Sequence, residues 1–104
     1  MNTVKNGQVR TIIFKEENTW YGVALEFNIV VEGDTYEAAN FDLLEAIRGY
    51  VDSLKKIKGF RSHAINSSLN QLADQEYENI WDKLQANKPV PSPIQVKSFG
   101  FMRV

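Results

Sequence analysis

Short apolar blocks rich in β-branched and aromatic residues fill the first third of the chain and predict three β-strands. The blocks are residues 9–15 (VRTIIFK), 20–26 (WYGVALE) and 29–32 (IVVE), and each ends in polar or glycine residues typical of turns. Gly22, inside the second block, predicts a bulge or a close backbone approach. Because the links between the blocks are short, the strands are expected to pair antiparallel as consecutive hairpins.

From residue 34 the apolar residues recur at steps of three and four, which predicts one long amphipathic helix. Asp34 as N-cap would place Glu37 where a carboxylate meets free backbone amides and the positive end of the helix dipole. The apolar stripe consists of Leu43, Leu44, Ile47, Tyr50 or Val51, Leu54 and Ile57. Lysines at 55, 56 and 58 followed by Gly59 predict the end of this helix.

A second, shorter helix is predicted at residues 74–86. Asp74 is its expected N-cap, and it should end near Asn87, before the extended segment with prolines at 89, 91 and 93. Its apolar residues are Tyr77, Ile80, Trp81 and Leu84.

Residues 94–104 predict a final strand whose alternation is imperfect. Ile94 and Val96 share one phase, whereas Phe99 and Phe101 take the other. A bulge near residues 98–100 would absorb the slip.

These elements predict an α+β fold in the order β-β-β-α-α-β: a three-stranded antiparallel sheet, a long helix, a second shorter helix and a final strand. The long helix would cover one face of the sheet, and the other face also carries apolar residues that need a cover. The helix at 74–86 is the candidate within the chain, and homo-oligomerisation through the sheet is the alternative.

Composition limits the chemistry. The 104 residues, 43% of them hydrophobic, suit a single domain, residues 1–104, with one core. With no cysteine and His63 as the one histidine, disulfides, thiol nucleophiles and two-histidine metal sites are excluded. A net charge of −1 predicts no strong attraction to nucleic acid or anionic membranes. We expect no enzymatic activity, no metal and no cofactor.

Other features of the sequence favour a cytoplasmic protein without a nucleotide fold. The glycines are too far apart for a phosphate-cradling loop. The cations of residues 55–61 suit a helix C-terminus better than a phosphate-binding patch. The N-terminus lacks the apolar run of a secretory signal, and no apolar segment is long enough to span a bilayer.

The run from residue 20 to residue 47 resembles the HicB-like antitoxin family. The pieces that carry the resemblance are Gly33-Asp34-Thr35, Glu37 with Ala39, and Glu45-Ala46-Ile47. It covers about residues 9–58, and segment 90–93 (VPSP) looks like the proline-containing lead into that family's last strand. Residues 60–88 look like a helical insertion before that strand.

The resemblance implies a degenerate ribonuclease H-like domain that neutralises a HicA-like toxin, a small basic ribonuclease that cleaves mRNA. A ribonuclease H site needs carboxylates on its first strand to hold magnesium, and residues 11–14 contain none. Many family members end in a DNA-binding domain. This sequence ends at its predicted final strand, which leaves operator binding in doubt.

Large aromatic residues in a small domain either complete the core or anchor a partner. We expect acidic residues near the strand ends to complement a basic partner, with aromatic residues as apolar anchors. The expected partner-binding residues are Trp20, Tyr21, Glu26, Phe27, Glu32 and Asp34. The alternative is an orphan HicB-like protein that self-assembles or binds another cytoplasmic protein, with no toxin partner.

Overall fold

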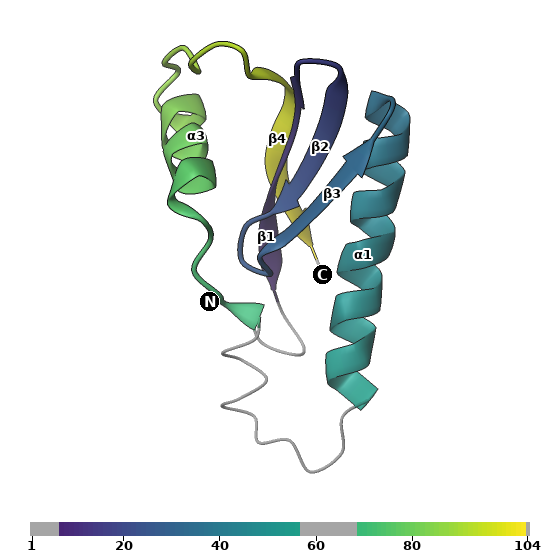
Figure 1. Cartoon of the computed structure of the whole chain (residues 1–104). Coiled ribbons are helices and arrows are strands. Elements are labelled where there is room, and N and C mark those ends of the chain that lie inside the picture. Colours follow the sequence, from purple (N-terminus) through teal and green to yellow (C-terminus); the bar gives the residue numbers. More distant parts are fainter. Residues whose placement is uncertain (1–6, 57–68, 104) are drawn as a thin grey trace.

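The computed structural model describes residues 7–56 and 69–103. These residues form one antiparallel β-sheet and the α-helices that pack on it. Its elements are β1 (Gln8–Glu16), β2 (Thr19–Ala24), β3 (Ile29–Gly33), α1 (Tyr36–Lys56), α3 (Gln75–Gln85) and β4 (Gln95–Arg103). This is the predicted α+β order β-β-β-α-α-β. The final strand joins the sheet beside β1, which gives four strands in the order β3-β2-β1-β4 (Figure 1).

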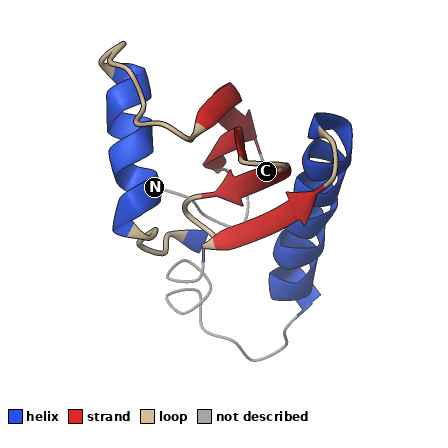
Figure 2. Ribbon diagram, turned by 45° about the horizontal axis from the view of Figure 1, so that its top comes forward, coloured by secondary structure: helices blue, strands red, loops and turns tan. Residues whose placement is uncertain are grey.

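The sheet lies between α1 on one face and α3 on the other (Figure 2). Alternation along β1 and β2 sends apolar side chains to both faces, so each helix covers its own core. The α1-side core contains Val9, Ile13, Ala24, Phe27, Ala39, Leu43, Ile47, Val51, Leu54 and Leu69. The α3-side core contains Ile12, Phe14, Val23, Leu25, Ile80 and Trp81. The predicted helix at 74–86 therefore covers the second face from within the chain.

Two glycines allow α1 to lie close to the sheet. A Cβ on Gly22 would lie 3.1 Å from Val31 Cγ2 and 3.2 Å from Leu43 Cβ. The β1–β2 register runs without interruption past this residue, so Gly22 marks a close approach and not a bulge. At Gly33 the space is smaller still, because a Cβ would lie 2.8 Å from the backbone nitrogen of Ala39.

The N-cap of α1 is one residue later than predicted. The Thr35 hydroxyl accepts a hydrogen bond from the Ala38 amide at 3.1 Å, and the Thr35 carbonyl accepts one from Ala39. Thr35, not Asp34, therefore satisfies the first free amides of the helix. At α3 the predicted cap is confirmed, since the Asp74 side chain accepts from the Glu76 amide at 3.0 Å.

The predicted bulge in the final strand lies at Lys97, one residue earlier than expected. Ile13 pairs with Ser98 but Phe14 pairs with Val96, so Lys97 is the extra residue. The bulge shifts the alternation, and Val96, Phe99 and Phe101 consequently share the α3 side of the sheet.

Candidate protein-binding surface

Four of the six predicted partner-binding residues lie at one end of the β2–β3 hairpin. Trp20 pairs with Gly33 and Tyr21 pairs with Glu32, while Asp34 follows at the start of the link to α1. We call Trp20, Tyr21, Glu32 and Asp34 the hairpin corner. It joins two half-buried aromatic rings to two exposed carboxylates.

The aromatic residues of the hairpin corner point to opposite faces of the sheet. The Trp20 ring packs edge-on against Tyr36 with centroids 5.8 Å apart, on the α1 side. Tyr21 stacks on Phe14 at 5.3 Å, on the α3 side. Both rings support a core with one side and are half-buried, so each can also contribute apolar surface to a partner.

The carboxylates of the hairpin corner are available for a partner. Glu32 and Asp34 are both exposed, and neither forms an ion pair with another residue in the described ranges 7–56 and 69–103. Val30 shares the face of Glu32 and is 45% exposed, which extends the apolar part of this surface. Glu37, in the first turn of α1, adds a third exposed carboxylate.

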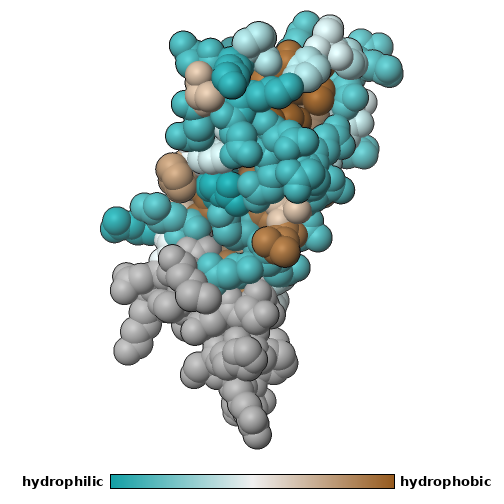
Figure 3. Space-filling model, turned by 90° about the vertical axis from the view of Figure 1, so that its left-hand side faces the viewer, coloured by the Kyte–Doolittle hydropathy of each residue, from teal (hydrophilic) through white to brown (hydrophobic). Residues whose placement is uncertain are grey.

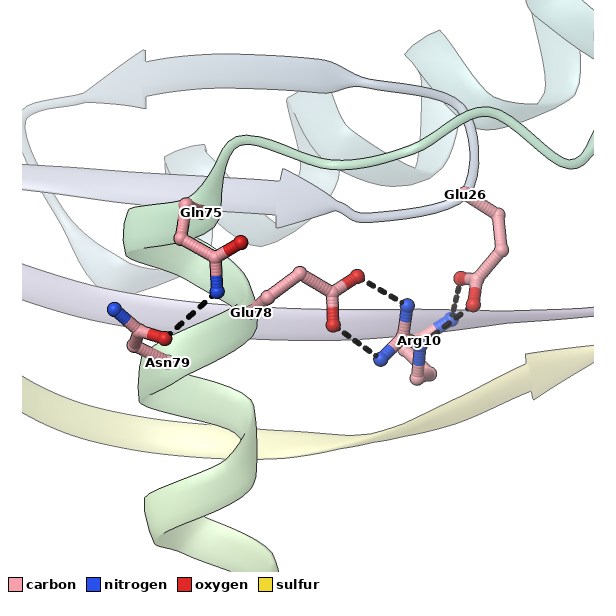
Figure 4. Close-up of polar contacts among 5 residues, drawn as sticks. All are labelled: Arg10, Glu26, Gln75, Glu78 and Asn79. Carbon is pink, nitrogen blue, oxygen red and sulfur yellow. Dashed lines mark hydrogen bonds and ion pairs between the residues drawn. The ribbon is translucent and has the colours of Figure 1, made fainter.

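Glu26 lies elsewhere and has a structural role. It follows β2, at the end of the hairpin where Ala24 pairs with Ile29, opposite the hairpin corner. Its carboxylate accepts from the Arg10 backbone amide at 2.7 Å and from Arg10 Nε (Figure 4). The three predicted acidic residues therefore do not form one patch.

Arg10 joins β1 to α3 through the same guanidinium. Its two terminal nitrogens donate to the Glu78 carboxylate at 2.9 and 2.7 Å, and its guanidinium carbon lies 5.5 Å from the Trp81 ring centroid. The hydrogen bonds to Glu78 raise the pKa of Arg10 further above its ordinary value, against the opposing effect of burial, and Glu26 adds to the rise. The guanidinium is thus a permanent cation between two carboxylates.

Phe27 belongs to the interior. It is 2% exposed and packs on the Tyr50 ring at a centroid distance of 4.9 Å. A partner cannot reach this side chain while the α1-side core is intact, so Phe27 fixes the β2–β3 link.

Sequence reasoning missed the exposed apolar residues of β4. Phe99 and Phe101 are 44% and 62% exposed, although both contact the Trp81 ring. On the other side of β4 an open groove of about 260 Å³ is lined by Thr11, Ile13, Asn40, Leu43, Leu44 and residues 98–102. The change in the apolar–polar alternation of β4 was visible in the sequence. The exposed fraction of the two phenylalanines, however, depends on how much of the sheet each helix covers.

Other candidates lie outside the described residues or have no supporting cluster. The range 57–68 is outside the described part of the chain, and it contains Ile57, Lys58, Gly59, Arg61 and His63.

Within the described ranges no group of three or more His, Asp or Glu side chains could hold a metal ion. Among the described residues, neither α1 nor α3 contains an apolar stretch that could span a lipid bilayer. The side that carries α3 is largely hydrophilic, with separate apolar spots (Figure 3).

Comparison of the chain with protein-family models, curated proteins and solved structures finds no match.

Proposed function

We propose that this protein is an antitoxin-like binding module that neutralises a small basic HicA-type mRNA-cleaving toxin by binding it. The observation that supports this most is the hairpin corner, where exposed carboxylates without ion-pair partners among the described residues adjoin half-buried aromatic rings. A basic protein would neutralise Glu32 and Asp34 and cover apolar surface of Trp20 and Tyr21. Because the two rings point to opposite faces of the sheet, such a partner would contact both sides of this end of the hairpin, and the carboxylates would steer its association.

The resemblance to the HicB-like family supplies the identity of the partner in this proposal. Gly33-Asp34-Thr35 carries part of that resemblance, and two of its residues have structural roles here. Gly33 lets the strand touch the first turn of α1, and Thr35 caps that helix. Asp34 has neither role and is exposed, so it is free to act in binding.

A charge-reversed variant tests the proposal. Glu32→Lys is expected to weaken inhibition of the toxin's mRNA cleavage by about tenfold and to slow association at low ionic strength. Asp52→Lys is the matched control, because Asp52 is also exposed and lies about 24 Å along α1 from its first turn. Equal inhibition by both variants would remove the hairpin corner from the proposed interface.

The second candidate function is an orphan protein that self-assembles or binds another cytoplasmic protein. The exposed phenylalanines of β4 favour it, because a large apolar side chain left exposed beside another marks an interaction surface. A toxin-free homo-oligomer, purified from the cells that produce the protein, is the result that would support this candidate.

A further inference from the structure

Among residues 7–56 and 69–103, no strand pairs with the outer edge of β4, which is the longer of the two edge strands of the sheet. In this part of the chain the order β3-β2-β1-β4 gives β4 one neighbour, and β4 has nine residues without a proline. The other edge, β3, has five residues. Proteins usually guard long edges with charges, prolines or bulges. Here the bulge lies at Lys97 and the charges lie at Lys97 and Arg103, so the five residues between them, 98–102, contain no charge, proline or bulge.

Both faces of this edge carry bare apolar surface. Phe99 and Phe101 contact the Trp81 ring at 5.9 and 5.4 Å and remain 44% and 62% exposed. A strand added beside β4 would place alternate side chains next to these rings.

The α1 side offers the second apolar contact. The groove there has Leu43 and Leu44 on the α1 wall and Gly100 and Met102 on the β4 wall. A Cβ on Gly100 would meet nothing within 4 Å, so the strand is open at this residue. A side chain from an added strand can therefore lean over Gly100 into the groove.

The charges of β4 select the chemistry of the occupant. Lys97 and Arg103 are its charged residues, and neither forms an ion pair with the residues that the structure describes. They are separated by about 20 Å along the strand. Antiparallel pairing of two copies about Gly100 would set Lys97 opposite Arg103 of the second copy, which is repulsive.

A nucleic acid is disfavoured as the occupant because α3 carries the exposed carboxylates Glu76 and Asp82. This helix contacts both phenylalanines of β4 through Trp81.

We propose that β4 binds an extended segment of another protein, apolar in its middle and with carboxylates about six residues apart, which adds a fifth strand to the sheet. Backbone hydrogen bonds would supply affinity, and the groove, the two phenylalanines and the two cations would supply selectivity. This surface lies on the opposite edge from the hairpin corner, so the inference stands independently of the proposed toxin.

Titration of the full isotope-labelled chain with two synthetic peptides, EVTLTVE and KVTLTVK, tests the inference by NMR. EVTLTVE is expected to shift the amide signals of residues 97–103 and to bind about tenfold more tightly than KVTLTVK at low salt. The double variant Lys97→Glu with Arg103→Glu should reverse this preference. Lys83→Glu with Lys88→Glu, which changes the same charge on and just after α3, should keep it.

A groove-filling variant separates the apolar contribution from the charges. Gly100→Leu has room in the fold, so its unfolding midpoint should match the wild type while EVTLTVE binding falls about fivefold. Equal binding of both peptides, or shifts confined to β3, would overturn the inference. So would a stable dimer through β4 in light scattering, or displacement of EVTLTVE by decauridine.

Discussion

Gly33 is where the sheet and the long helix touch backbone to backbone. A Cβ there would lie 2.8 Å from the Ala39 nitrogen, and that atom belongs to a helix that cannot move alone. Gly33→Ala is therefore expected to lower the free energy of unfolding by about 1–3 kcal/mol, measured by urea denaturation.

The same substitution at Gly49 is the matched control. Gly49 is exposed in α1, and an added Cβ meets nothing within 4 Å. Gly49→Ala should raise the free energy of unfolding by about 0.5–1 kcal/mol through helix propensity. Two variants with the same small change in stability would contradict the close packing at Gly33.

Tyr77 makes the free energy of unfolding depend on pH in the alkaline range. Burial raises the pKa of its phenol, and the nearby carboxylates of Glu76 and Asp74 raise it further. The unfolded chain then loses this proton first, near pH 10, so it binds fewer protons than the folded chain. Stability should fall as the pH rises above about 10, and Tyr77→Phe should make that fall shallower in urea denaturation series. Identical slopes for both proteins would contradict this role.

At the scale of elements, Arg10 adds polar contacts to the apolar packing that attaches α3 to the sheet. Its guanidinium holds Glu78 on α3 and Glu26 after β2, and all three side chains are about one-quarter exposed or less. Arg10→Met keeps an unbranched apolar side chain at this position but removes the guanidinium above Trp81 and leaves two carboxylates without their donor. We expect a loss of about 2–3 kcal/mol in unfolding free energy.

Arg48→Met provides the comparison for Arg10. Arg48 and Glu45 form an exposed pair at 3.5 Å within α1. Removing it should cost less than about 0.5 kcal/mol. Comparable losses at the two arginines would mean that α3 is held by apolar packing alone.

Most elements were predictable because their determinants are local. The strands follow from their β-branched runs, and α3 follows from its Asp74 cap and apolar spacing. The contact between Arg10 and Glu78 was not predictable, because it joins residues 68 positions apart. The choice of Thr35 over Asp34 as N-cap depends on where β3 ends against α1, which the sequence pattern does not specify.

At the scale of the molecule, the fold brings only four of the six predicted partner-binding residues close together. Trp20, Tyr21, Glu32 and Asp34 meet because β2 and β3 pair in a fixed register. Phe27 is buried and Glu26 serves Arg10, and both outcomes depend on packing between distant elements. Phe99 and Phe101 remained unassigned because their exposure is set by the reach of α3 across the sheet.

The two edges of the sheet differ in charge and length, which suggests two separate roles. The β3 edge is short and leads into exposed carboxylates, whereas the β4 edge is long and carries cations. A basic partner is expected at the first edge and an acid-flanked strand at the second. Glu32→Lys should therefore leave EVTLTVE binding unchanged.

The most direct test of the proposed function is native affinity purification from the cells that produce the protein, followed by an mRNA-cleavage assay on whatever co-purifies. We predict a stoichiometric small basic protein whose cleavage of mRNA stops when this protein is added back. A homo-oligomer without such a partner, or a partner whose cleavage continues in the presence of excess protein, would contradict the proposed antitoxin function.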